Sequence, residues 1–298
     1  MTDPEKRLEA NEDARRASLP EWSSIATFPL IEMAAAILLY FASAAFGTLL
    51  GSLLPASPAG SIAKDAIVLG LVIATYKLAI VRLGEIPRDD LEVTDSLPGL
   101  GKGVLAGLVI FTVVVGIAFA LGVYKIVGSG DFSGMLAALV GVAMVPAFTE
   151  ELLFRGILFR WIEEFAGSWA ALGLTSALFG LAHILNPGAT WFSSLAIAVE
   201  AGLLLGAVYM LTRSLWMPIG LHAAWNFVEG PVFGVPVSGG PASGAIRASI
   251  TGPQLLSGGP FGLEGSVIAV VVATSAGVWF LRLAIKRGEL VRPSWERH

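Results

Sequence analysis

The feature that most constrains this chain is a series of apolar segments long enough to cross a lipid bilayer. A transmembrane helix needs about 20 consecutive, mostly apolar residues, because it must span the hydrocarbon layer at about 1.5 Å per residue. Eight such segments, bounded by charged residues or by Gly and Pro, are found at 27–54, 66–83, 103–124, 134–162, 168–185, 193–212, 215–233 and 265–285. We expect the fourth to tilt or break near Pro146, whose missing N–H disrupts a helix.

The composition supports a membrane protein and excludes several other classes. Of the 298 residues, 55% are hydrophobic and only 14% are charged. The mean hydropathy of +0.76 is far above that of a soluble domain of this length. Cysteine is absent, which excludes disulfides, thiolate catalysis and Cys-ligated metal sites. The net charge of −4 forms no basic stripe, so we expect no nucleic-acid partner.

The distribution of Lys and Arg predicts the orientation in the membrane. With the N-terminus in the cytoplasm, about 14 of these residues lie on the cytoplasmic side, about 3 outside (Lys64, Lys125 and Arg247) and about 2 within the membrane (Lys77 and Arg155). Cytoplasmic segments normally carry the excess of Lys and Arg. The sequence therefore predicts a multi-pass protein of the cell membrane with both termini in the cytoplasm.

The sequence contains no internal repeat and predicts one membrane domain. A polar cytoplasmic tail is expected at 1–26, a transmembrane helical domain at 27–287 with its motif-bearing core at 134–233, and a cytoplasmic C-terminal tail at 288–298. The Gly-, Pro- and Ser-rich stretch 234–262 has no periodicity of its own, and we interpret it as an external connecting loop.

A polar cluster interrupts the fourth apolar segment, in FTEELLFRGILFR. A charged side chain at the bilayer centre costs roughly 2.5 to 3.5 kcal/mol on insertion scales, so Glu150, Glu151 and Arg155 must be paired or hydrated. Glu151 and Arg155 are four residues apart on one helix face and can form an ion pair, which would also suit a purely structural role. Glu150 points about 100° away around the helix and is free to face a cavity.

Two further apolar segments carry histidine. In LFGLAHILN, His183 follows Phe179 by four residues, and in GLHAAWNF, Asn226 follows His222 by four. A single histidine in an apolar helix is most often a hydrogen-bonded core residue. These two, however, are the only histidines besides the C-terminal residue, and both lie in membrane spans. We therefore predict an intramembrane polar cavity shared with Glu150, within an all-α bundle of about eight transmembrane helices.

These residue types suit hydrolysis of an amide bond inside the membrane. Glu150 could act as general base on a water molecule that His183 orients or shares. His222 and Asn226 could stabilise the developing oxyanion. Glu150, His183 and His222 could instead bind Zn²⁺. Because the HExxH motif is missing, we rank metal-free activation of water ahead of zinc, with no other cofactor expected.

Other protease chemistries fit the sequence less well. No Asp lies within a span, which removes an aspartyl dyad. Ser176 lies seven residues before His183 and could form a Ser–His dyad, but that arrangement would leave Glu150 without a role.

The order EExxxR, FxxxH and HxxxN, in three separate apolar segments, resembles the CPBP family of CAAX prenyl endopeptidases and bacteriocin-processing enzymes, also called the Abi family. The stretch GLLLGAVYMLTRSLWMPIGLHAAWNF is similar to that family as well. The resemblance implies a CAAX-type intramembrane endopeptidase that hydrolyses a membrane-associated protein or peptide. The site residues it implies are Glu150 as base, Glu151 and Arg155 as its support, His183, His222 and Asn226 as the rest of the site, and Phe179 packed beside them.

Two alternatives belong to other classes. A non-catalytic membrane scaffold or immunity protein of the same fold would have no reason to bear the insertion cost of six polar residues. An ion-coupled transporter could use Glu32, Lys77, Glu150 and Glu200 as a path, but the absence of repeats argues against it. For Glu200 we expect a structural role, either lining the cavity or pairing with Lys77.

Overall fold

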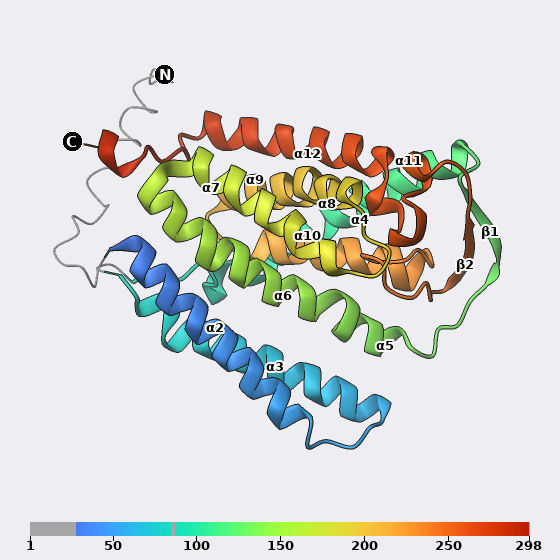
Figure 1. The fold of residues 1–298 in the computed structure, drawn as a ribbon, viewed down its shortest axis with the longest axis horizontal. Helices are drawn as coiled ribbons and strands as arrows, with labels where there is room; N and C mark the ends of the chain where they lie inside the picture. Colours follow the sequence, from blue (N-terminus) through green and yellow to red (C-terminus); the bar gives the residue numbers. More distant parts are fainter. Residues whose placement is uncertain (1–27, 85–86, 298) are drawn as a thin grey trace.

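The computed structural model describes residues 28–84 and 87–297. The tail predicted at 1–26 lies outside these residues. Five helical stretches within them are long and apolar enough to cross a membrane: Pro29–Gly51, Val93–Ala120, Met135–Leu185, Trp191–Thr212 and Val267–Lys286. The predicted class, a helical polytopic membrane protein, is therefore confirmed (Figure 1). The count of eight spans stays a prediction.

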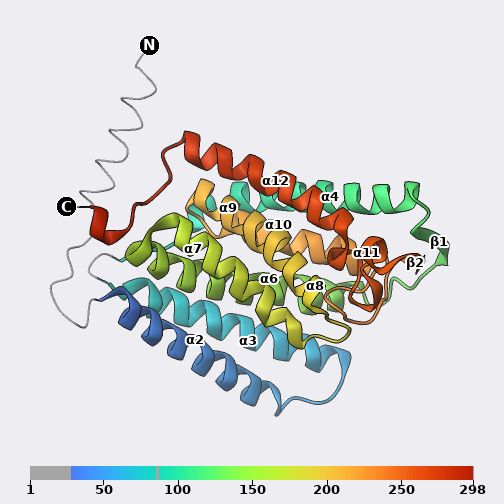
Figure 2. The ribbon, with the colours of Figure 1, turned by 45° about the horizontal axis from the view of Figure 1, so that its top comes forward.

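The first described elements, α2 (Pro29–Gly51) and α3 (Pro58–Leu78), form a helical hairpin. Ser57 caps α3 by accepting a hydrogen bond from the Gly60 amide, and Pro58 suits the first helical position because its missing N–H would be unpaired there anyway. The hairpin packs along one side of the bundle, where α2 contacts α7 and α3 contacts α6 (Figure 2).

Glycines in α4 (Ser96–Ala120) allow α10 (Trp216–Phe227) to approach it closely. A Cβ atom at Gly103 would lie 2.2 Å from the Met217 carbonyl oxygen, and one at Gly107 would lie 2.4 Å from that of Leu221. From the other side, a Cβ at Gly220 would lie 2.5 Å from the Leu100 carbonyl oxygen. Small residues permit such backbone contact in membranes, and here they fix the helix that carries His222 and Asn226.

The motif-bearing segment is a continuous helical stretch with two π-helical turns. It comprises α5 (Met135–Ala138), a π-turn at Leu139–Met144, α6 (Val145–Glu151), a π-turn at Leu152–Phe159, α7 (Arg160–Ala182) and a 3₁₀ turn at His183–Leu185. The expected break at Pro146 is absent. The first π-turn ends at Met144, two residues before Pro146, so the wider turn lies where the proline removes a helical hydrogen bond.

The chain reverses direction inside α7, at Gly167. This glycine has φ 81° and ψ 169°, a conformation that disfavours residues with a Cβ atom. A Cβ there would also lie 2.9 Å from the backbone of Val291 and Pro293. The reversal makes Met135–Leu185 two antiparallel passes, in agreement with the predicted segments 134–162 and 168–185.

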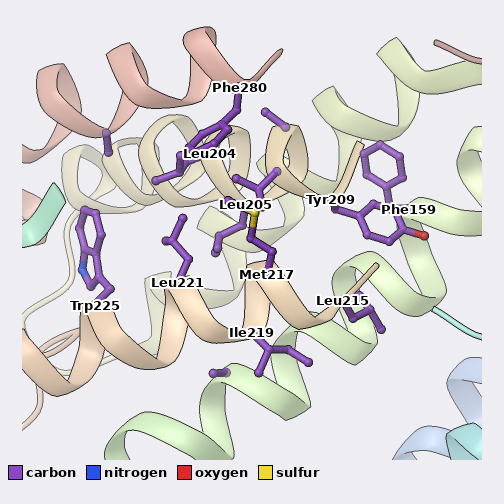
Figure 3. Packing of buried hydrophobic residues seen from close by; sticks show 14 of the residues in the cluster. Phe159, Leu204, Leu205, Tyr209, Leu215, Met217, Ile219, Leu221, Trp225 and Phe280 are labelled. Atoms are coloured by element: carbon purple, nitrogen blue, oxygen red, sulfur yellow. The ribbon is translucent and has the colours of Figure 1, made fainter. Parts of the chain in front are cut away.

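The remaining helices complete the bundle. They are α8 (Trp191–Ile197), a π-turn at Ala198–Gly202, α9 (Leu203–Thr212), α10 with a π-turn at Val228–Val232, and α12 (Val267–Lys286). Leu204 and Leu205 of α9, Met217 and Leu221 of α10, and Phe280 of α12 pack against one another in the core (Figure 3).

The predicted connecting loop at 234–262 contains more structure than its composition indicated. Its strand β2 (Ile246–Ile250) pairs antiparallel with β1 (Tyr124–Ser129), and α11 (Gln254–Ser257) follows. This sheet lies at the end of the bundle opposite the beginning of α2 and the end of α12, which lie together at the other end (Figures 1 and 2). We call these the sheet end and the terminal end of the bundle.

Candidate active site

A cavity of about 560 Å³ contains the predicted polar residues. Glu150 from α6, His183 from the end of α7, and His222 and Asn226 from α10 all line it. The segment 131–135 and the Gly-, Pro- and Ser-rich segment 230–244 supply much of the remaining wall. The structure thus brings together four side chains that three separate sequence motifs contribute.

Behind the cavity wall, Glu151 lies at the centre of a buried charge network. Its Oε1 atom accepts a hydrogen bond of 2.8 Å from Arg155 Nη1, as the four-residue spacing predicted. The same oxygen accepts one of 3.0 Å from His222 Nδ1, a contact that the sequence could not indicate. Arg155 also donates to the carbonyl oxygens of Ala201 and Gly202. Glu151 therefore links α6 to α10 through His222, and Arg155 links the same segment to the π-turn before α9.

Glu150 faces the cavity instead. Its Oε2 atom is buried and has no hydrogen-bond partner among the described residues. The adjacent backbone is held in place by Tyr40 of α2, whose hydroxyl donates to the Thr149 carbonyl oxygen at 3.0 Å. Tyr40 carries no motif signal, and only the packing of the hairpin against α6 reveals it.

His183 has a fixed ring orientation. Its Nδ1 atom lies 2.7 Å from the carbonyl oxygen of Phe179. A carbonyl oxygen only accepts hydrogen bonds, so Nδ1 carries the proton and Nε2 of the neutral ring is an acceptor. The Phe179 ring lies against the His183 ring, with 4.8 Å between the two ring centroids. The Arg155 guanidinium lies 4.9 Å from the centroid of the Phe179 ring. Phe179 thus packs between His183 and Arg155.

The two α10 residues are anchored as well. His222 donates from Nδ1 to a carboxylate, so its Nε2 donates a hydrogen bond only when the ring is protonated. Asn226 donates from Nδ2 to the Val142 carbonyl oxygen at 3.2 Å, which links α10 to the π-turn at 139–144. An amide nitrogen has two protons, so one of them remains for the cavity.

A second cavity of about 30 Å³, large enough for one water molecule, lies beside both histidines. Glu200 and Glu264 line it, and neither oxygen of Glu200 has a hydrogen-bond partner in the described part of the chain. The possible Glu200–Lys77 pair is wrong, since Lys77 forms an ion pair with Asp89. Glu264 lies in the 3₁₀ turn Leu263–Gly265, just before α12, where no spacing motif marks it.

The structure also bears on zinc and on the other chemistries. Within residues 28–84 and 87–297, no three His, Asp or Glu side chains gather as a metal ion would require, so Glu150, His183 and His222 do not form such a set. Ser176 packs against Gly202, away from the residues that line the large cavity.

The proposed ion path is also divided among separate contacts. Trp161 donates to Glu32, Lys77 pairs with Asp89, and Glu150 and Glu200 line two different cavities. Glu32 and Lys77 thus contact residues outside the proposed path, whereas His183 and His222 line the cavities of both Glu150 and Glu200.

The fold and the cavity together define a helical membrane protein with a carboxylate–imidazole site. Residues 132–228, about a third of the chain, match the model of the family described as type II CAAX prenyl endopeptidase Rce1-like. No curated protein and no solved structure matches the chain. The matched residues include all three motifs, which supports membership of the CPBP family for this part of the chain.

Proposed function

We propose that this protein is an intramembrane endopeptidase that hydrolyses a peptide bond of a membrane-associated protein or peptide in the large cavity. One observation carries the proposal: the unpartnered carboxylate of Glu150 lines the same cavity as His183, His222 and Asn226. A structural salt bridge would account for Glu151 and Arg155 but would leave Glu150 unexplained.

In this mechanism Glu150 and His183 activate a water molecule. The Glu150 carboxylate takes one proton from the water while the acceptor nitrogen Nε2 of His183 orients its second hydrogen. The hydroxide so generated adds to the carbonyl carbon of the peptide. Glu150 then returns its proton to the leaving nitrogen when the C–N bond breaks, so protons balance over the cycle.

His222 and Asn226 stabilise the oxyanion that forms on the carbonyl oxygen. Asn226 offers its second amide proton, and protonated His222 donates from Nε2 while its Nδ1 remains bonded to Glu151. Arg155 holds Glu151 in position. The charged pair therefore positions the catalytic imidazole without contacting the substrate.

The test is cleavage of a fluorescence-quenched peptide library by purified protein in detergent. Glu150→Gln keeps the size of the side chain and removes the base, and it should lower kcat/KM by roughly 100-fold or more with KM little changed. Glu296→Gln, an exposed glutamate at the terminal end, is the matched control and should retain the wild-type rate. Unchanged cleavage by Glu150→Gln would remove Glu150 as base, and no cleavage of any peptide by the wild type would favour the scaffold.

A further inference from the structure

The large cavity lies toward the sheet end of the bundle. Its walls come from segments that lie at that end: 131–135 follows β1, 183–187 follows α7, and 230–244 leads from α10 to β2. Figures 1 and 2 both show β1, β2 and α11 at this end, opposite the beginning of α2 and the end of α12.

Packed side chains fill the route from the cavity to the terminal end. Glu150 and the reversal at Gly167 are about 25 Å apart along the helix, at about 1.5 Å per residue. The core beside this length contains the fully buried rings of Phe159, Trp161 and Tyr209. Figure 3 shows Phe159 and Tyr209 in contact, and their ring centroids are 5.2 Å apart. A peptide therefore reaches Glu150 from the sheet end.

The positive charges of the connecting segments lie at the other end. Among the described connections, those at the terminal end contain Arg82, Arg88, Arg213, Arg287, Arg292 and Arg297. Those at the sheet end contain Lys125 and Arg247. Segments rich in Lys and Arg stay in the cytoplasm when a membrane protein inserts. This asymmetry assigns the terminal end to the cytoplasm and the sheet end to the outside.

The rim of the cavity is built of small residues that are packed too closely to form a loose lid. The Gly239 amide donates to the Phe261 carbonyl oxygen at 2.8 Å, and a Cβ atom at Gly239 would lie only 1.8 Å from the Pro187 carbonyl oxygen. The Gly130 amide donates to the Ala245 carbonyl oxygen at 2.8 Å. Such a rim leaves the mouth lined by Gly, Pro and Ser, which suits an extended peptide better than a bulky folded surface.

We infer that the cavity opens on the extracytoplasmic face of the membrane, and that its substrates are extended polypeptide segments that have crossed the membrane and remain attached to its outer face. This inference rests on the proposed function. A protein tail lipidated in the cytoplasm and remaining there would meet only the terminal end of the bundle.

The absence of cysteine allows a direct test of the orientation. Ser243→Cys places an exposed thiol on the cavity rim, and Glu296→Cys places one at the terminal end. A membrane-impermeant maleimide should label Ser243→Cys in spheroplasts, and Glu296→Cys only in inverted vesicles or after detergent. The opposite labelling pattern would overturn the inference and leave the protease proposal untouched.

The substrate class is tested with two membrane-tethered reporters. Each joins a peptide found to be cut in detergent to a single transmembrane helix, with the peptide outside in one reporter and in the cytoplasm in the other. We expect cleavage of the outer reporter only, and none with Glu150→Gln. Cleavage of the cytoplasmic reporter alone would refute the inference while supporting the protease. If no peptide is cut even in detergent, the proposed function fails, and the labelling result still decides the orientation.

Discussion

At the scale of single residues, the two adjacent glutamates have different partners. Glu151 is fully buried and shares one oxygen between Arg155 and His222, whereas Glu150 lines the cavity with an unpartnered oxygen. The helical angle of about 100° between neighbouring residues is enough to separate them. Sequence spacing predicted this division. The bond from His222 to Glu151 depends on the packing of α10 and could not be predicted.

Removing Arg155 should destabilise the protein severely. Arg155→Met keeps much of the volume of the side chain but leaves the buried Glu151 without its cation, which typically costs about 3 to 5 kcal/mol. The free energy of unfolding, measured by denaturant titration in micelles, should fall by that amount. Arg82→Met, at an exposed arginine, is the control and should cost less than about 1 kcal/mol. If both variants lost the same free energy of unfolding, the buried Glu151–Arg155 pair would contribute nothing to stability.

Glu200 should be replaceable, in contrast to Glu150. Both of its oxygens are buried without a hydrogen-bond partner on the described residues, so Glu200→Gln loses no contact and removes an acidic group from the neighbourhood of Glu264. We expect stability within about 1 kcal/mol of wild type and cleavage within a few-fold. A loss of kcat as large as that of Glu150→Gln would instead assign Glu200 a part in proton transfer.

At the scale of elements, the glycines of α4 determine where α10, the helix that carries His222 and Asn226, lies. Gly103 packs against the backbone of α10, whereas a Cβ atom at Gly101, two residues away, would have no neighbour within 4 Å. The sequence shows these glycines but not the helix that packs against them, because any of several helices could pack there. The strand β2 was missed for a related reason: it is five residues long, lies in a Gly-rich segment, and forms only by pairing with the distant β1.

The pair Gly103→Val and Gly101→Val separates packing from helix propensity. Both variants add the same β-branched side chain to one helix, so their intrinsic effects are similar. Only Gly103→Val forces a side chain against the Met217 carbonyl oxygen and moves α10. It should lower cleavage and the melting temperature strongly, while Gly101→Val remains close to wild type. Similar behaviour of the two variants would contradict the close packing of α4 and α10.

At the scale of the whole molecule, the family match and the cavity cover different parts of the chain. The match ends at residue 228, yet Pro231, Ser238 and Gly244 line the large cavity, and Tyr40 supports it from the first hairpin. The three motifs indicated that Glu150, His183, His222 and Asn226 share a cavity, because helical spacing sets the face of each residue locally. The cavity wall at 230–244 and Glu264 come from segments without a motif, so they could be found only in the folded chain.

The complete fold also yields a prediction about metal. Glu150, His183, His222 and Asn226 line one cavity. Among the described residues, however, no three His, Asp or Glu side chains are close enough together to bind one metal ion. Glu151, the acid bonded to His222, already shares its Oε1 atom with Arg155. We therefore expect 1,10-phenanthroline and EDTA to leave the cleavage rate within about twofold of its initial value, since no step depends on a metal-bound water. A known zinc peptidase in the same detergent provides the positive control. Loss of cleavage on chelation, restored by added Zn²⁺, would refute metal-free activation by Glu150 and His183.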